Sequence, residues 1–410
     1  MRYNEADVRP ILSILFLLSA CSFEAAPRAF EGGEHVGAKR GSMFHVLINA
    51  YYLQEESARA LRRGEAQSAI LEEVLGKAKR MGATLIRSNA YNDAPHKAGD
   101  SVIQYAAGQY DEVGLRALDL VLTRAHAHGL RLLLPLGNFW DAYGGARQYC
   151  LWAGLSDARE GDSRFFTERR VVELYKTYIR HLLTRTNHFD GIPYAEHPAI
   201  FGWELLNEAR GRGLDDEGRQ MRAWVDEIGA LIRSLSPRSR ISTGEEGFDH
   251  RDAHYDADFW QSSAAAGWMF HQGTSFRRNL ESPFVDFGSV HIYPDGWGIP
   301  AGASLVAGFR WIEERSAIAA ELGKPLLIGE FGLRAREGAI ESLEERRAIY
   351  REWFAAARRA GAIAAGPWLF AHDSRPDGWD PYSFYLYEGT ELSDPRNRYA
   401  DIVAEAARSE

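Results

Sequence analysis

Residues 114–138 read GLRALDLVLTRAHAHGLRLLLPLGN, and this stretch contains both kinds of element from which the fold is built. Over residues 114–129 the apolar side chains recur every three or four positions, which predicts an amphipathic helix. Residues 130–138 form an almost continuous apolar run, which is typical of a strand covered on both faces in a parallel sheet. A helix that leads directly into such a strand predicts an α/β fold.

The same alternation continues along the chain in both directions. We expect eight strands, at residues 44–51, 83–89, 130–138, 199–207, 239–245, 286–293, 324–331 and 362–370. Helical periodicity separates them, as in residues 114–129, 169–185, 219–235 and 343–361. Eight repeats predict a (β/α)8 TIM barrel with enlarged loops. A doubly wound open sheet is the alternative, but no Gly-rich phosphate-binding turn follows the first strand.

Composition excludes several classes of protein. The 410 residues are 45% hydrophobic and 26% charged, as in globular proteins, and the formal net charge is -9. A nucleic-acid partner is not expected, because such binders carry an excess of basic residues. The chain has only two cysteines, Cys21 and Cys150, so a disulfide scaffold is not expected either.

The N-terminal residues resemble an export signal. Residues 11–20 (ILSILFLLSA) are apolar but shorter than the roughly 20 residues that span a bilayer. Leu18-Ser-Ala-Cys21 is similar to a bacterial lipoprotein box, in which the chain is cut before the cysteine and the cysteine is acylated. We therefore expect a signal peptide at 1–20, a flexible tether at 21–42 and a catalytic domain at 43–410. Cys21 would be the only membrane attachment, and the protein would be lipid-anchored in a bacterial envelope. The alternatives are a plain signal peptide, which would make the protein secreted, and a mis-assigned start.

Polar and aromatic side chains follow the expected strands at their carboxyl ends, where TIM barrels carry their active sites. The set comprises Arg87, Asn138, Trp140, Asn207, Glu208, His291, Tyr293, Glu330, Trp368 and Phe370. Glu208 follows the fourth strand and Glu330 ends the seventh, so the two carboxylates should face each other across the mouth. Two facing carboxyl groups are the apparatus of glycoside hydrolysis.

Several motifs resemble glycoside hydrolase family 5 enzymes of the β-mannanase type. They occur in the order and spacing of that family from about residue 44 to 370, and they are LGNFWDAYGG (136–145), FGWELLNE (201–208), GEEGF (244–248), GTSF (273–276), HIYPDGW (291–297) and GEFG (329–332). The resemblance implies a (β/α)8 barrel, a retaining mechanism and β-1,4-linked mannose in the substrate. It implies no cofactor and no metal.

The resemblance also implies roles for individual residues. Glu208 matches the acid/base and Glu330 the nucleophile. The remaining matches are substrate-binding or supporting positions: Arg87 and Tyr293 as donors to the nucleophile, Asn207 at the sugar 2-hydroxyl, His291 near the acid/base, Asn138 beside them, and Trp140 and Trp297 as walls for sugar rings. Substrates would be mannan, glucomannan, galactomannan or their oligosaccharides, cleaved by a monomer.

The eighth strand departs from the family pattern. The family places a tryptophan there as the floor of the cleavage subsite, and in GPWLFAHD (366–373) either Trp368 or Phe370 could serve. Residues two apart on a strand share a face, so both could reach the mouth. The loop at 372–387 also differs, and a changed loop could close one end of the cleft. Exo action is therefore the alternative to endo action.

Other readings of the sequence remain open. A β-1,4-glucanase would share the two glutamates, whereas a non-catalytic glycan-binding lipoprotein would have a broken pair. Glu204 is expected to be a barrel-interior carboxylate held by a cation or amide, and Glu245 and Glu246 to shape a loop. The acidic and histidine residues of 249–256 could suggest a metal-dependent hydrolase, but a solvated polar loop explains them better.

Overall fold

The computed structural model describes residues 44–94, 101–215, 217–251, 254, 257–262, 266–334, 342–375 and 380–408. The expected signal peptide, Cys21 and the tether lie outside the described residues. No helix in the described part of the chain has the length and apolar character needed to cross a bilayer.

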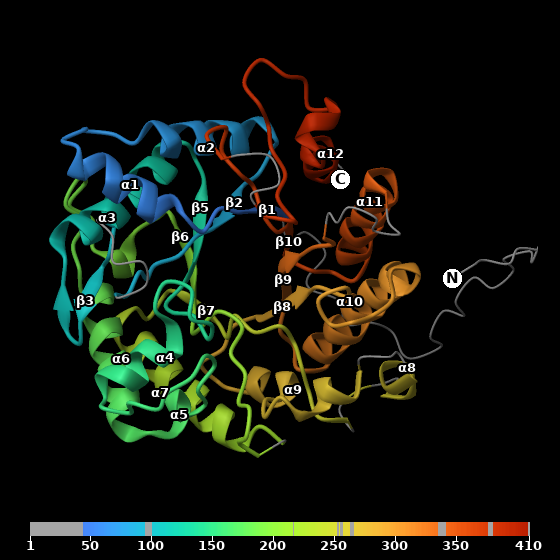
Figure 1. Ribbon diagram of the computed structural model, residues 1–410, viewed down its shortest axis with the longest axis horizontal. Helices are drawn as coiled ribbons and strands as arrows, with labels where there is room; N and C mark the ends of the chain where they lie inside the picture. Colours follow the sequence, from blue (N-terminus) through green and yellow to red (C-terminus); the bar gives the residue numbers. More distant parts are fainter. Residues whose placement is uncertain are drawn as a thin grey trace, which may run out of the picture. The chain divides into compact units, whose positions relative to one another are not determined.

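Eight parallel strands form the barrel at the centre of Figure 1. They are β1 (His45–Asn49), β2 (Leu85–Arg87), β5 (Arg131–Pro135), β6 (Ile200–Glu204), β7 (Arg240–Ser242), β8 (Gly288–Ile292), β9 (Leu326–Phe331) and β10 (Ala364–Pro367), paired in the order β7-β6-β5-β2-β1-β10-β9-β8. Two backbone hydrogen bonds join the outer strands, from the Asp286 amide to the Ile241 carbonyl (2.8 Å) and from the His291 amide to the Glu246 carbonyl (3.3 Å). The predicted TIM barrel is confirmed, and each strand lies within its expected range.

Helices cover the outside of the barrel; in Figure 1, α10 and α11 lie outside β8, β9 and β10. The main helices are α1 (Leu53–Arg62), α2 (Ala69–Arg80), α3 (Glu112–Ala127), α6 (Arg169–Leu183), α7 (Arg219–Leu235), α10 (Ser304–Glu321), α11 (Leu343–Arg359) and α12 (Ala400–Arg408). Shorter elements in the loops are α4 (Gly145–Trp152), α5 (Arg164–Thr167), α8 (Ala257–Ser262), α9 (Phe276–Leu280) and the hairpin of β3 (Gln104–Ala106) and β4 (Gln109–Tyr110).

One apolar layer fills the barrel interior near the amino ends of the strands. Its side chains are buried and consist of Leu47, Leu85, Leu133, Phe201, Phe287, Leu327 and Ala364. Gly366 on β10 allows close packing here, because a Cβ at this position would lie 2.2 Å from the Leu47 carbonyl oxygen. Asn49 and Arg87 follow two residues after members of this layer, so they share its inward face and lie nearer the mouth.

Asp93 is a fully buried carboxyl beneath the loop that leads to α4. Its amide donates to the Tyr143 carbonyl (2.9 Å), and a Cβ on Gly144 would lie 2.5 Å from the Asp93 Cβ. No cationic side chain among the described residues contacts the carboxyl, and its surroundings include only the hydroxyl of Tyr149 as a donor. Burial therefore raises the pKa of Asp93 well above its ordinary value, and Tyr149 only partly offsets this.

We expect Asp93→Asn to stabilise the protein increasingly as the pH rises. The folded chain keeps a proton on Asp93 that the unfolded chain loses above the ordinary aspartate pKa, so the wild type loses about 1.4 kcal/mol per pH unit until its raised pKa is passed. Asparagine does not ionise and escapes this loss. Urea unfolding of both proteins between pH 4 and 8 measures the difference, with the exposed Asp157→Asn as control. A difference independent of pH would contradict a protonated Asp93.

Candidate active site

Glu330 on β9 is held by two donors, one on each carboxyl oxygen. Arg87 Nη1 donates to Oε1 at 2.5 Å, and the Tyr293 hydroxyl donates to Oε2 at 2.5 Å. The carboxyl is nearly buried, with 4% of the residue exposed. Its orientation is therefore fixed, and both donors favour its ionised form.

Arg87 connects Glu330 to two further groups. Its Nε donates to Glu204 Oε2 (2.6 Å) and its Nη2 to Asn207 Oδ1 (2.7 Å). Ser289 Oγ donates to the other oxygen of Glu204 (3.0 Å). The expectation that Glu204 is a barrel-interior carboxylate held by a cation is confirmed.

Glu208 follows β6 with a backbone φ of 53°, a left-handed conformation that is uncommon outside glycine. Its amide donates to the Gly244 carbonyl at 2.8 Å, which fixes this turn. Its Oε1 lies 2.8 Å from Nδ1 of His291, and its Oε2 accepts from Trp140 Nε1 at 2.6 Å. The turn thus directs the side chain toward the mouth, where the two donors fix it.

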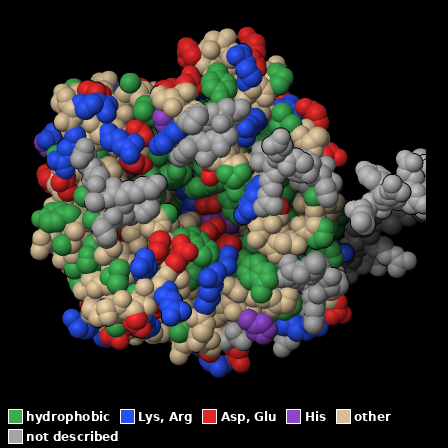
Figure 2. All heavy atoms as spheres, viewed as in Figure 1, with side chains coloured by type: hydrophobic (Ala, Val, Ile, Leu, Met, Phe, Trp, Pro, Cys, Tyr) green, Lys and Arg blue, Asp and Glu red, His purple; other side chains and the backbone are tan. Residues whose placement is uncertain are grey.

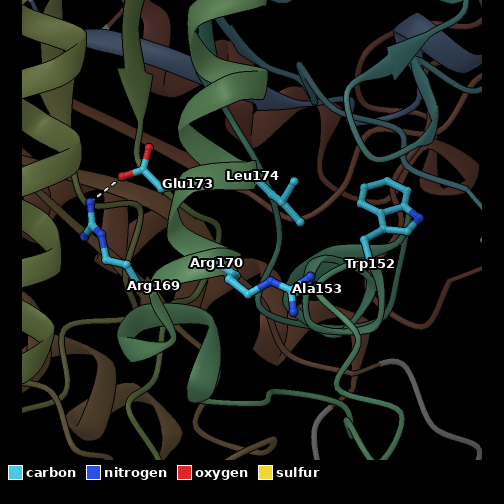
Figure 3. Close-up of a pocket in the computed structure, with 6 residues that line it drawn as sticks. All are labelled: Trp152, Ala153, Arg169, Arg170, Glu173 and Leu174. Atoms are coloured by element: carbon cyan, nitrogen blue, oxygen red, sulfur yellow. Dashed lines mark hydrogen bonds and ion pairs between the residues drawn. The ribbon is translucent and has the colours of Figure 1, made fainter.

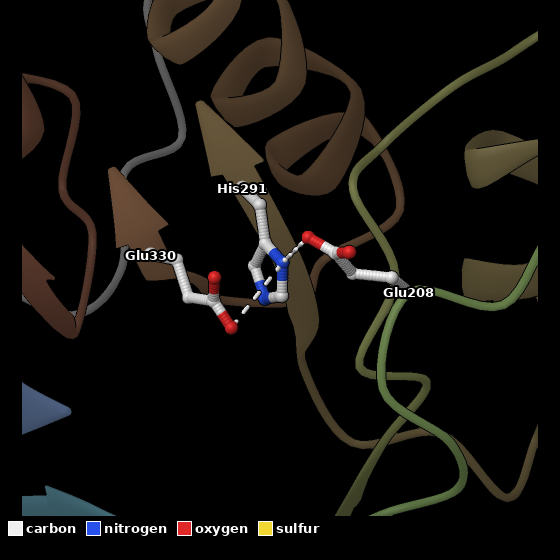
Figure 4. A group of neighbouring side chains, drawn as sticks. All are labelled: Glu208, His291 and Glu330. Carbon is white, nitrogen blue, oxygen red and sulfur yellow. Dashed lines mark hydrogen bonds and ion pairs between the residues drawn. The ribbon is translucent and has the colours of Figure 1, made fainter. Parts of the chain in front are cut away.

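His291 lies between the two glutamates (Figure 4). Its Nδ1 is 2.8 Å from an oxygen of Glu208 and 3.7 Å from Glu330 Oε1, and one atom of each of the three side chains lies within 4.8 Å of the others. Gly329 makes room for the imidazole, because a Cβ there would lie 3.0 Å from His291 Nε2. Carboxyls this close match the separation of roughly 5–5.5 Å in retaining glycosidases rather than the wider inverting one.

The surroundings of Glu330 and Glu208 shift the pKa values of the two carboxyls in opposite directions. Burial raises the pKa of Glu330, the charge of Glu208 adds to this, and His291, Arg87 and Tyr293 oppose it. Burial also acts to raise the pKa of Glu208, but His291, Arg210 and Trp140 outweigh it and the pKa falls to about 2. The two groups titrate as a pair, so over the range between their pKa values the pair holds one proton. A retaining mechanism also requires one proton on the pair, but on Glu208, whereas these shifts favour Glu330 as its carrier when no substrate is bound.

The two asparagines continue the same network. Asn207 Nδ2 donates to Asn138 Oδ1 (3.0 Å), which also accepts from the Trp140 amide (3.3 Å). Asn138 Nδ2 donates to the Ala142 carbonyl at 3.1 Å, so its amide holds the loop together. The structure therefore joins the predicted residues Arg87, Asn138, Trp140, Asn207, Glu208, His291, Tyr293 and Glu330 by hydrogen bonds. Figure 2 shows this face as a hollow with acidic and histidine side chains at its base and hydrophobic ones around it.

Arg210 supports the wall beside Glu208 and was missed from the sequence. Its guanidinium forms two hydrogen bonds with Glu246 (2.6 and 2.7 Å) and lies 5.0 Å from the Trp140 ring centroid. It also lies 4.9 Å from Phe248 and 5.4 Å from Trp268. Its place two residues after Glu208 is the only sequence signal for this role. Glu246 is thus the partner of Arg210, and burial, opposed by Arg210, raises its pKa to about 7.

Two expected sugar contacts are corrected. Phe370 is fully buried and packs against Phe384 (5.2 Å), whereas Trp368 is partly exposed. Residues two apart share a face only within a strand. Because β10 ends at Pro367, one residue before Trp368, Trp368 and Phe370 do not point the same way. Trp368 is therefore the available floor; its backbone amide donates a hydrogen bond to the Phe331 carbonyl of β9 (2.9 Å), and its ring stacks on Tyr51.

Trp297 is the second correction. Only 4% of the residue is exposed, because its ring packs against Trp311 (4.9 Å) and Phe248 (5.6 Å). It stabilises the loop after β8 and offers little surface to a sugar.

Two other candidate sites carry less chemistry. Asp252 and Asp256 lie outside the described residues, and His254 is buried against Phe270 (5.0 Å) rather than solvated as expected.

A hollow between α4 and α6 is lined by Trp152, Leu174 and their neighbours (Figure 3). Its acid, Glu173, is ion-paired with Arg169 and with Lys176. Neither place brings two free carboxyls together among its described residues.

Comparisons with known proteins agree with this geometry. A family profile described as "GH family 5 beta-mannosidase-like" matches residues 32–395. Mannan endo-1,4-beta-mannosidase 1 of Oryza sativa subsp. japonica is 35% identical over 348 residues, covering 81% of this chain and 76% of that protein. Mannan endo-1,4-beta-mannosidase 2 of Arabidopsis thaliana is 36% identical over 298 residues, covering 70% of this chain and 64% of that protein.

A solved structure shows the same architecture. The endo-beta-1,4-mannanase of Thermotoga petrophila superposes with a TM-score of 0.75 at 28% identity, covering 90% of this chain and 77% of that one. The chain therefore belongs to glycoside hydrolase family 5, in its β-mannosidase-like group.

Proposed function

We propose that the protein is a retaining endo-β-1,4-mannanase that cleaves mannan, glucomannan or galactomannan as a monomer. The observation that carries the proposal is the glutamate pair, whose oxygens lie within 4.8 Å around His291. The substrate is supported by relatives named mannan endo-1,4-beta-mannosidase, at 35% identity over most of the chain. Both reacting carboxyls come from this chain, and water is the co-reactant of the second step.

In the first step, Glu330 attacks the anomeric carbon and Glu208 protonates the departing glycosidic oxygen. Arg87 and Tyr293 hold Glu330 by one hydrogen bond on each oxygen, so the attacking group is oriented before the substrate arrives. The reacting state of the pair is the one with its proton on Glu208 and with Glu330 ionised, whereas the pKa shifts of the free protein favour the proton on Glu330, so the proton changes place before the attack. The C–O bond to the leaving sugar breaks as the bond from Glu330 forms, which produces a glycosyl-enzyme.

In the second step, Glu208 removes a proton from water, and that water releases the sugar from Glu330. Glu208 then carries the proton with which the next cycle starts. His291 and Trp140 keep the Glu208 carboxyl in place through both steps. Asn207, fixed by Arg87 and Asn138, presents an amide near the sugar 2-hydroxyl, a contact that strengthens in the transition state.

A product time course tests the proposed substrate and mode of action. The protein is incubated with linear β-1,4-mannan, carboxymethyl cellulose and mannohexaose, and the products are separated. A spread of short manno-oligosaccharides from the first time point is expected. Mannose or mannobiose alone would replace endo by exo action, and cleavage of the cellulose derivative alone would overturn the mannan assignment.

We expect kcat/KM to follow a bell-shaped pH profile with widely separated limbs. Activity needs a singly protonated pair, so it falls in acid when the second proton binds and in alkali when the last proton leaves. The lowered pKa of Glu208 places the acid limb below ordinary glutamate values, and the raised pKa of Glu330 places the alkaline limb above them. Initial rates on mannohexaose from pH 1.5 to 9, with the folded state checked at the acid end, measure both limbs. One sigmoidal limb would contradict a coupled pair.

We further propose that Cys21 carries a lipid that anchors the enzyme to a bacterial envelope through the tether at 21–42. The support is the apolar run at 11–20 and the box Leu18-Ser-Ala-Cys21. Mass spectrometry of the N-terminal peptide tests it. A diacylated or triacylated Cys21 is expected, and an unmodified N-terminus further along the chain would indicate a plain secretory signal instead.

A further inference from the structure

The barrel end opposite the mouth carries two arginines that have no acidic partner among the residues the structure describes. Arg131 begins β5 and Arg240 begins β7, on either side of β6. Their guanidinium carbons lie 4.9 and 4.8 Å from the ring centroid of Phe201, which belongs to the apolar layer inside this end of the barrel. The two cations are therefore separated by no more than the sum of these distances. Neither arginine forms an ion pair with an acid among the described residues.

His45 completes the cluster without adding negative charge. Its Nε2 lies 2.9 Å from Arg131 Nη2, and its Nδ1 lies 2.8 Å from Thr84 Oγ1. Arginine can only donate, so Nε2 is the acceptor and the imidazole is neutral. Burial, followed by the charges of Arg131 and Arg240, lowers the pKa of His45 to about 4. The histidine thus orients Arg131 and leaves its charge uncompensated.

Two acids in the segments that flank β6 and β7 already have partners of their own. Asp286, at the start of the segment that leads into β8, accepts from Arg233 Nη2 (2.6 Å) and from the Ile241 amide (2.8 Å). Glu196 pairs with the exposed Arg238 at 3.3 Å. Other described arginines without a carboxylate partner, such as Arg80 and Arg358, donate to a backbone carbonyl, whereas Arg131 and Arg240 have His45 as their one hydrogen-bond acceptor among the described residues. Burial, followed by the charge of Arg240, lowers the pKa of Arg131.

We propose that Arg131 and Arg240 form a binding site for a phosphate-type oxyanion at the amino end of the barrel. Guanidinium groups recognise phosphate oxygens through paired N–H donors, and Arg131 has spent only one donor on His45. An oxyanion between the arginines would accept from both and remove their repulsion. His45 is the first residue of β1, so the chain enters the barrel beside this site. Free phosphate and a phospholipid headgroup share the chemistry that the site recognises.

The first experiment measures Tm of the full chain against phosphate concentration, with chloride keeping the ionic strength constant. Phosphate is expected to raise Tm of the wild type in a saturable way. Arg131→Gln or Arg240→Gln should weaken the apparent affinity for phosphate about tenfold, because each substitution removes one charged hydrogen-bonding partner. Arg238→Gln, at the same end but paired with Glu196, serves as matched control and should respond like the wild type. Equal responses in all four proteins would overturn the site, as would no response in the wild type.

Stability without phosphate is the second readout. Arg240 is exposed, so Arg240→Gln is expected to fold, and relief of repulsion should leave its Tm equal to or above that of the wild type. A lower Tm combined with no phosphate dependence would mean that the arginines only cover Phe201, and would overturn the proposal.

Vesicles distinguish the two sources of the oxyanion. Full chain and the Arg131→Gln/Arg240→Gln double variant are compared on neutral phosphatidylcholine and on vesicles containing phosphatidylglycerol. A loss of binding confined to the variant on anionic vesicles identifies the headgroup as ligand. Equal binding of both proteins to both vesicles, with the Tm effect intact, identifies free phosphate. Hydrolysis of soluble mannohexaose should not change in any variant. A negative result for the phosphate site would therefore leave the proposed catalytic function untouched.

Discussion

Glu330→Gln is expected to lower kcat on β-1,4-mannan by at least about 10⁴-fold, with little change in affinity for mannohexaose. Glutamine has nearly the same shape and still offers an oxygen to Arg87, but it cannot attack the anomeric carbon. Arg87 also keeps its second partner, Glu204, so the variant retains a paired cation in the barrel. Steady-state kinetics and isothermal titration calorimetry with mannohexaose measure the two quantities separately.

A matched control for this substitution lies outside the mouth. Glu173 on α6 is also an ion-paired glutamate, bound to Arg169 and Lys176, and Glu173→Gln should leave kcat unchanged. Turnover by Glu330→Gln within about tenfold of the wild type would overturn the nucleophile assignment, since no remaining group could supply a covalent step of that efficiency.

Glu208→Gln is expected to lose about 10²–10⁴-fold on mannan, because the departing sugar oxygen then leaves without a proton. The loss should depend on the leaving group. A dinitrophenyl β-mannoside needs no proton in the first step, so the glycosyl-enzyme should form at nearly the wild-type rate and then accumulate, because no base activates the water. Stopped-flow measurement should show a burst of dinitrophenolate followed by slow turnover.

The two variants should therefore differ in the kinetic step that fails as well as in the size of the activity loss. Glu330→Gln should show no burst with the dinitrophenyl substrate, because no covalent intermediate forms. If Glu208→Gln lost the same factor on both substrates and showed no burst, Glu208 would be a binding group and not the acid/base.

The fold follows from local patterns in the sequence. Eight apolar runs alternate with helical periodicity, and each run contains the strand that the structure shows, because parallel barrel strands are buried on both faces. The polar residues at the strand ends were predictable for the same reason: once the strands are placed, their carboxyl ends define the mouth. Arg87, Glu208 and Glu330 meet there as expected.

The remaining features depend on contacts that no local pattern encodes. Phe370 turns into the core because β10 ends at Pro367 and strand alternation stops applying. Trp297 is buried by Trp311, which comes from a different part of the chain. Arg210 acquires its role only when the fold brings Glu246 to its guanidinium.

The anomeric configuration of the first product tests the central claim most directly. Glutamate oxygens within 4.8 Å leave no room for a water between carboxyl and sugar, so hydrolysis should proceed through a glycosyl-enzyme with two inversions. Proton NMR of mannohexaose hydrolysis, recorded before mutarotation, should show the β-anomer first, with the α-anomer growing in later. The α-anomer appearing first would mean single displacement by water and would contradict Glu330 as nucleophile.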